Sequence, residues 1–301
     1  MEDRGHLLTE RRNPRSMHLD TMSITEAFDL LNAEDATLPQ AVAAARDDIC
    51  AAIALVVEAF TSGGRLFYIG AGTSGRLGVL DASECPPTFL SDPSMVQGII
   101  AGGPDALRRS IEGAEDHPED AQAEIDAHDV GPKDVVFGIA TGGTTPYVHA
   151  AIERARQRGA KTVFFACVSK QDVPDEADVS IRVLVGPEVV TGSTRMKAGT
   201  ATKMVLNTIT TIAMVRIGKV YQNLMVDVNT RANAKLVDRG TRMIQAVTDL
   251  PREAARELLD RADGRVKVAL VMQACNVDPA QARQRLAVTD GHIARILEST
   301  A

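Results

Sequence analysis

The fold is decided by the stretch Arg65-Leu-Phe-Tyr-Ile-Gly-Ala-Gly-Thr-Ser-Gly-Arg76. A run of apolar residues stops at Gly70, small residues follow, and a helical spacing of apolar residues begins at Leu77. This pattern predicts a strand, a tight turn and a helix. The first N–H groups of such a helix, together with the hydroxyls of Thr73 and Ser74, suit a phosphate group.

The same alternation of strand and helix continues along the chain. We predict strands at 65–69, 96–101, 134–140, 161–168 and 180–185, and helices at 75–84, 104–114, 118–128 and 145–158. Several of these strands are almost entirely apolar, which is typical of parallel strands covered on both faces. We therefore expect an α/β fold with a doubly wound parallel sheet, and ligands beyond the carboxyl ends of its strands.

Helical patterns flank this region on both sides. Ser23-Ile-Thr-Glu26 has the sequence of a capping box, and from about Ala198 the spacing of apolar residues is helical again. We expect N-terminal helices in 1–60, the sheet domain in 61–225 and a helical region in 226–301. The tail from Val266 to Leu297 resembles a small three-helix module of the ubiquitin-associated type.

Composition excludes several classes of partner. The 301 residues include 40 acidic and 33 basic side chains, a formal net charge of -7, which argues against nucleic acid. No apolar run approaches the ~18 residues of a membrane span, so we expect no membrane partner. The four cysteines form no CxxC pair, which favours reduced thiols over a disulfide framework or a zinc site. We expect a cytoplasmic protein.

The first glycine-rich loop matches two nucleotide-binding motifs only in part. Gly70-Ala-Gly-Thr-Ser-Gly75 fits G-x-G-x-x-G, but the next predicted strand ends in Gly102-Gly-Pro104 and lacks the acidic residue that a dinucleotide fold requires. A P-loop would need Lys and Ser or Thr where Arg76 and Leu77 stand. The loop therefore indicates a phosphate site of another kind.

Two further polar loops follow predicted strands: Ala140-Thr-Gly-Gly-Thr-Thr-Pro146 and Gly186-Pro-Glu-Val-Val-Thr-Gly-Ser-Thr-Arg-Met-Lys197. Each has a purely structural explanation as a tight turn, a helix cap or a solvated charge. Glu188 is either an acceptor for a sugar hydroxyl or an exposed loop acid. The two glycine-rich loops together favour binding, whereas the charges of the 186–197 loop fit a binding site and a solvated surface equally well. The candidate residues are Gly72, Thr73, Ser74, Thr141, Gly142, Thr144, Thr145, Ser193, Thr194 and Lys197.

Several longer motifs resemble those of a known family, and the match covers nearly the whole chain. They are Thr9-Glu-Arg-Arg-Asn-Pro-Arg-Ser16, Leu19-Asp-Thr-Met-Ser23, Gly70-Ala-Gly-Thr-Ser-Gly-Arg-Leu-Gly78, Asp81-Ala-Ser-Glu-Cys-Pro-Pro-Thr88, Glu112-Gly-Ala-Glu-Asp116, the 186–197 loop and Asn223-Leu-Met-Val-Asp227. The family is that of the N-acetylmuramic acid 6-phosphate etherases. The resemblance implies a sugar isomerase (SIS) domain, a fold shared with the glucokinase regulatory protein.

The resemblance also implies an activity. It is the cleavage of the C3 lactyl ether of N-acetylmuramate 6-phosphate to N-acetylglucosamine 6-phosphate and D-lactate, a lyase step of peptidoglycan recycling. The implied route is elimination followed by water addition, with no metal and no nicotinamide cofactor. By motif, Glu84 is the acid and Glu115 the base. The resemblance further implies a phosphorylated amino sugar as ligand and a homodimer.

The reaction needs two carboxyl groups in opposite protonation states. Because Cys85 precedes two prolines, we expect the helix to end near Glu84, where the negative end of the helix dipole favours a protonated acid. No comparable feature of the sequence indicates the protonation state of Glu115, whose role as the base is implied by the family resemblance alone. Two alternatives remain: a phosphosugar sensor without catalysis, and an aldose–ketose isomerase of the same fold.

Overall fold

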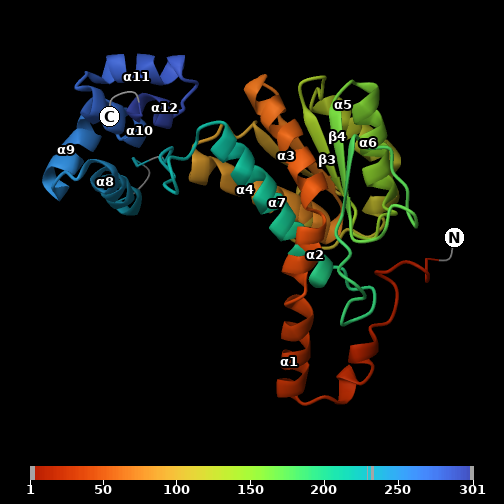
Figure 1. Cartoon of the computed structure of the whole chain (residues 1–301). Coiled ribbons are helices and arrows are strands. Elements are labelled where there is room, and N and C mark those ends of the chain that lie inside the picture. The colour runs from red at the N-terminus through yellow and green to blue at the C-terminus, as the bar shows by residue number, and fades with distance from the viewer. Residues whose placement is uncertain (1–3, 229, 232–233, 299–301) are drawn as a thin grey trace. The chain divides into compact units, whose positions relative to one another are not determined.

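The computed structural model describes residues 4–228, 230–231 and 234–298. The chain forms two compact units. The first, here called the sheet unit, comprises Met1–Ser83 and Ser94–Thr210, and the second, here called the helical unit, comprises Glu84–Pro93 and Thr211–Ala301. Figure 1 follows the chain from red at the N-terminus to blue at the C-terminus. No helix among the described residues is long and apolar enough to cross a membrane.

The sheet unit is built on a parallel sheet, as predicted. In the described residues the strands lie in the order β2-β1-β3-β4-β5, and every neighbouring pair is parallel. The strands are β1 Leu66–Gly70, β2 Val96–Ile100, β3 Val135–Ile139, β4 Lys161–Ala166 and β5 Val179–Arg182. Every residue of β1 and β3 is buried, because helices cover both faces of the sheet.

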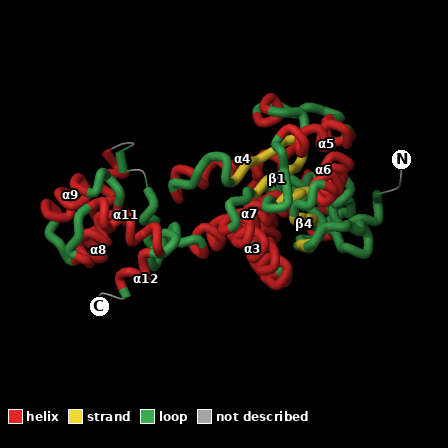
Figure 2. The backbone as a smooth tube through the Cα atoms, turned by 90° about the horizontal axis from the view of Figure 1, so that it is seen from above, coloured by secondary structure: helices red, strands yellow, loops and turns green. Residues whose placement is uncertain are grey.

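Helices α5 (Pro118–Ala127) and α6 (Pro146–Gln157) cover one face of the sheet. On that face β3 has Gly138, where a Cβ would lie 2.7 Å from a methyl of Val148 in α6. Figure 2 shows α6 and α5 on the side of the strands opposite to α3 (Arg46–Thr61) and α7 (Lys197–Arg216). The predicted layered α/β architecture is confirmed.

A buried polar network fixes the other face. The Tyr68 hydroxyl of β1 donates to Asp81 Oδ2 at 3.0 Å, and the Asn207 amide of α7 donates to Asp81 Oδ1 at 2.5 Å. Asp81 lies on α4 (Gly72–Phe89) and is 5% exposed, so burial raises its pKa. The network therefore ties strand β1 to α4 and α7 on the face opposite to α6.

Helix α4 does not end near Glu84 as the two prolines suggested. It continues through Pro86 and Pro87 to Phe89. Prolines remove two backbone donors, but Cys85 and Phe89 are buried, and burial of this last turn offsets the lost hydrogen bonds. The argument that a helix end keeps Glu84 protonated is therefore wrong.

The predicted helix at 104–114 is also wrong. The segment contains only two short 3₁₀ turns, η3 (Pro104–Leu107) and η4 (Ala114–Asp116). Leu107 and Ile111 are exposed by 39% and 37%, so no buried apolar face stabilises a helix here. Gly113, with φ of 76°, leads into η4, a backbone conformation that suits glycine.

The remaining helices lie at the two ends of the chain. The N-terminal ones are η1 Pro14–Ser16, η2 Leu19–Thr21, α1 Ile24–Asp35 and α2 Leu38–Ala44, and the predicted capping box at the start of α1 is present. The helical unit contains α8 Ala234–Thr248, α9 Arg252–Arg261, α10 Val266–Cys275, α11 Pro279–Val288 and α12 Ile293–Leu297. The last three form the predicted three-helix tail, and their apolar residues belong to one core that α8 and α9 share.

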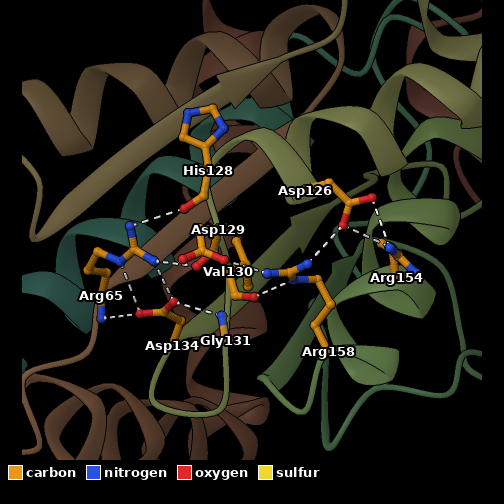
Figure 3. A network of polar contacts seen from close by, with 9 residues as sticks. All are labelled: Arg65, Asp126, His128, Asp129, Val130, Gly131, Asp134, Arg154 and Arg158. Atoms are coloured by element: carbon orange, nitrogen blue, oxygen red, sulfur yellow. Dashed lines mark hydrogen bonds and ion pairs between the residues drawn. The ribbon is translucent and has the colours of Figure 1, made fainter.

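A salt-bridge network aligns the amino ends of β1 and β3 (Figure 3). The buried Asp134 carboxylate accepts hydrogen bonds from Arg65 N at 2.9 Å, from Arg65 Nη2 at 2.8 Å and from Gly131 N at 3.0 Å. Arg65 Nη1 also donates to the carbonyl of His128 at 3.2 Å. One side chain thus holds the start of β1 against the loop that leads into β3.

We expect Asp134→Asn to lower the free energy of unfolding by about 2–3 kcal/mol, because it leaves the half-buried Arg65 guanidinium without its charged partner. Asp126→Asn is the matched control, since Asp126 pairs with Arg154 and Arg158 at the surface and should matter much less. Denaturant unfolding followed by circular dichroism measures both. Equal losses in the two variants would contradict the assigned role of Asp134.

Candidate functional site

A cavity of about 230 Å³ opens in the sheet unit at the carboxyl ends of β1 and β3. Parallel strands place their carboxyl ends at one edge of the sheet, which is where this fold class binds ligands. The loops after β1 and β3, the 186–197 segment, the η4 turn and the N-terminal segment all contribute. The lining residues are Arg4, Glu10, Ala71, Gly72, Thr73, Ser74, Glu115, Asp116, Ile139, Thr141, Gly142, Thr144, Thr145, Pro146, Gly192 and Thr194.

The first wall of the cavity is the turn between β1 and α4. A Cβ at Gly75 would lie 2.6 Å from the carbonyl oxygen of Gly70, so only glycine allows the helix to begin so close to the strand end. Gly72 has φ of 51°. The turn presents the first N–H groups of α4 with the Thr73 and Ser74 side chains, a geometry that suits an anion.

The second wall is the loop after β3. Gly143, with φ of 81°, donates its N–H to the Ala140 carbonyl at 2.7 Å, and its own carbonyl lies 2.6 Å from His149 Nε2 of α6. Thr145 is the N-cap residue of α6, yet its side chain makes no capping hydrogen bond. Thr144 and Thr145 thus line the cavity on a loop that a contact with His149 of α6 holds in place.

The third wall comes from the segment before α7. Thr194 and Gly192 line the cavity, whereas Ser193 and Lys197 do not. Glu188 is neither exposed nor directed at the cavity: its carboxylate is fully buried and accepts the N–H groups of Lys197 and Ala198, each at 2.9 Å. It caps the start of α7 and so fixes the segment; burial raises its pKa.

The Lys197 side chain is committed to a buried ion pair. Its Nζ lies 2.6 Å from Glu34 Oε2 of α1, and Glu34 also accepts from Asn13 at 2.9 Å and from Arg15 at 2.7 Å. Burial alone would raise the pKa of Glu34, but Lys197, Asn13 and Arg15 hold it below its ordinary value. Lys197 thus anchors the N-terminal segment and does not line the cavity.

Glu115 lies at the cavity, beside Asp116 on the η4 turn. Gly102, just after β2, supports this turn: a Cβ there would lie 3.1 Å from Ile111 and 3.3 Å from Ala114. The close approach holds the exposed Glu115 side chain beside the threonine-lined wall, where a carboxylate can accept a proton from a bound ligand.

Glu84, the predicted acid, does not line the cavity either. It is exposed, lies on α4 and belongs to the helical unit, whereas every lining residue belongs to the sheet unit. Of the two predicted catalytic carboxyl groups, Glu115 therefore lines this cavity and Glu84 does not.

Seven lining residues were not among the predicted site residues: Arg4, Glu10, Ala71, Asp116, Ile139, Pro146 and Gly192. Four of them, Glu10, Ala71, Asp116 and Gly192, fall within motifs that carry the family resemblance, which was the available signal. Arg4 falls in no such motif, and its place at the cavity depends on how the N-terminal segment folds back over the loops.

Lys197→Met should lower the free energy of unfolding by about 3 kcal/mol at pH 7, because Glu34 would be left buried without its ammonium partner. The pKa of Glu34 is lowered in the folded protein, so its stabilising contribution is present above the ordinary value of 4.5 and is lost as the pH falls through the lowered pKa. The difference in the free energy of unfolding between the variant and the parent protein should therefore narrow below about pH 4.

Thermal and denaturant unfolding across pH 3–8 measure this gap. Arg195→Met is the matched control, since Arg195 is exposed, and it should leave stability nearly unchanged. A gap that stays constant with pH would argue against the Glu34 pair.

Comparison with known proteins agrees with this architecture. The model of the glucokinase regulatory protein N-terminal SIS domain matches residues 48–156, and that of the SIS domain matches residues 115–212. A candidate phosphosugar isomerase involved in capsule formation from Bacteroides fragilis superposes with a TM-score of 0.50 at 20% identity, over 67% of this chain and 95% of that one. This likeness shows the fold.

Full-length relatives are much closer in sequence. The N-acetylmuramic acid 6-phosphate etherase of Crocosphaera subtropica is 55% identical over 92% of this chain and 91% of its own length. The enzyme of the same name from Picosynechococcus sp. is 54% identical over 99% of both chains. The chain belongs to the N-acetylmuramic acid 6-phosphate etherase family.

Proposed function

We propose that this protein is a carbon–oxygen lyase that cleaves the C3 lactyl ether of N-acetylmuramate 6-phosphate to N-acetylglucosamine 6-phosphate and D-lactate. The observation that carries the proposal is sequence identity above one half with etherases over nearly the whole chain. The cavity adds a hydroxyl-lined wall and a carboxylate in one place. The reaction belongs to the recycling of cell-wall amino sugars.

The 6-phosphate is bound by the loops after β1 and β3. The N–H groups at the start of α4 carry the positive end of its dipole, and Thr73, Ser74, Thr141, Thr144 and Thr145 surround the same space. Thr194 closes the cavity from the third segment. Binding at this end directs the sugar ring toward Glu115.

Glu115 acts as the base. Opening of the sugar ring makes the hydrogen on C2 acidic, because the resulting carbanion is conjugated with the C1 aldehyde. Glu115 removes this proton, the C3–O bond breaks, and the electron pair forms the C2–C3 double bond. A carboxylate held at the cavity rim on η4 has the reach for such a transfer.

Glu84 acts as the acid that protonates the departing lactyl oxygen. The family motif supports this role. Water then adds at C3 and a proton returns to C2, with the two carboxyl groups in exchanged roles. The atoms balance: the ether and one water give one alcohol and one hydroxy acid.

A phosphosugar sensor without catalysis is the weaker alternative. It needs neither an acid nor a base, and the full-length relatives at over half identity carry the name of an enzyme. We also propose a homodimer and a cytoplasmic location, which follow from the family resemblance and from the composition.

Replacement of each glutamate separates the two half-reactions. We expect Glu115→Gln to lower D-lactate release at least about 100-fold and to abolish exchange of the C2 hydrogen in heavy water. Glu84→Gln should lower lactate release similarly but retain C2 exchange, because proton removal from C2 does not need the acid. Lactate is measured with a coupled dehydrogenase and exchange by NMR.

Glu112→Gln is the matched control, since Glu112 is exposed in the same segment but does not line the cavity. Full C2 exchange in Glu115→Gln would remove Glu115 from the role of base.

Loss of one hydroxyl from the cavity wall should weaken substrate binding rather than slow the chemical step. Thr144→Val removes a donor from the phosphate wall, so we expect KM to rise roughly tenfold while kcat changes little. Thr200→Val, an exposed position on α7, is the control. A fall in kcat at unchanged KM would place Thr144 in the chemical step instead.

A further inference from the structure

A second cavity lies wholly within the helical unit, and its volume is about 470 Å³. It opens between the amino end of α10, the middle of α11 and the segment that precedes α8. The charged residues that line it are Asp227, Asp263, Arg265, Lys267 and Arg283. None of these lines the cavity of the sheet unit.

Both acids of this cavity already have cationic partners. Asp227 Oδ2 accepts from Lys267 Nζ at 2.7 Å and lies 3.5 Å from Lys219 Nζ. Asp263 forms an ion pair with Arg231. Two lysines share one carboxylate, so this cluster keeps a net positive charge.

The two arginines of the cavity have no such compensation. Neither Arg265 nor Arg283 forms an ion pair with any residue in the described part of the chain. The positive field also acts on nearby groups: burial and then the charges of Arg295 and Lys267 lower the pKa of His292. This excess of positive charge is notable in a chain whose net charge is -7.

The cavity also has an apolar side, to which Val226, Val228 and Val268 contribute. Pockets of roughly 300–1,000 Å³ that combine apolar walls with a few charged groups are typical of small-molecule sites. The planar guanidinium group matches the oxygens of a phosphate in a two-pronged hydrogen bond. A ligand here would present an anionic group to the arginines and its carbon frame to the valines.

We propose that the cavity of the helical unit binds a phosphomonoester dianion, with Arg265 and Arg283 holding the phosphate and Lys267 completing the cationic wall. The two unpaired arginines, together with the surplus charge of the two lysines that share Asp227, suit a dianion better than a monoanion such as lactate. The side chain of Lys267 is only 9% exposed, so its charge is weakly screened by solvent. The site takes inorganic phosphate or the phosphate of a sugar ester by the same chemistry.

The test uses the full chain with methyl-labelled valine, whose resonances at Val226 and Val268 report on this cavity directly. Inorganic phosphate and N-acetylglucosamine 6-phosphate are added separately at constant ionic strength, with chloride as the control anion. We expect a saturable shift of these two resonances with phosphate, with the sugar ester, or with both. A response to the ester alone identifies the sugar phosphate as the source.

The double variant Arg265→Gln/Arg283→Gln should weaken this binding at least about tenfold. Arg261→Gln/Arg285→Gln is matched to it, since it removes the same charge from exposed positions outside the cavity and should leave the affinity unchanged. No saturable shift with either phosphate, or an unchanged affinity in the first double variant, would overturn the proposal. Lactate release is assayed in parallel, so failure here is distinct from failure of the etherase assignment.

Discussion

The carbonyl oxygen of Gly70 occupies the space that any side chain at Gly75 would need. Because both positions are glycine, strand β1 passes into α4 without an intervening loop, and the first turn of the helix faces the carboxyl edge of the sheet. The loop after β3, the neighbouring strand, reaches the same edge. The hydroxyl-lined cavity exists because these two turns meet there.

A buried ionic cluster holds the third side of the cavity in register with the other two. Glu188 caps α7, while Lys197, at the start of that helix, pairs with Glu34 of α1. Asn13 donates to both Glu34 and the carbonyl of Pro187. The cluster therefore connects the N-terminal segment, which supplies Arg4 and Glu10 to the cavity, with the segment that supplies Thr194.

The sheet, its parallel strands and most of the residues that line the cavity could be predicted from the sequence because they obey local rules. Apolar runs mark β1 and β3, and glycines mark the turns after them. The point where α4 ends and the absence of an α-helix in residues 104–114 could not be predicted, because burial of side chains decides both. Cys85 and Phe89 bury the turn that contains two prolines, whereas Leu107 and Ile111 stay exposed and form no helix. The burial of Lys197 depends likewise on Glu34, far away in sequence.

Most of the residues that line the cavity of the sheet unit are uncharged, and the charged ones are Arg4, Glu10, Glu115 and Asp116. A lining with one base and three acids does not draw an anion from a distance, and the net charge of -7 on the whole chain opposes its approach. An anionic ligand in this cavity would therefore be held by short-range hydrogen bonds, and electrostatic steering would not raise its rate of association. Because the lining carries no net positive charge, added salt has little long-range attraction to screen there, and no strong Coulombic attraction would delay the departure of an anion.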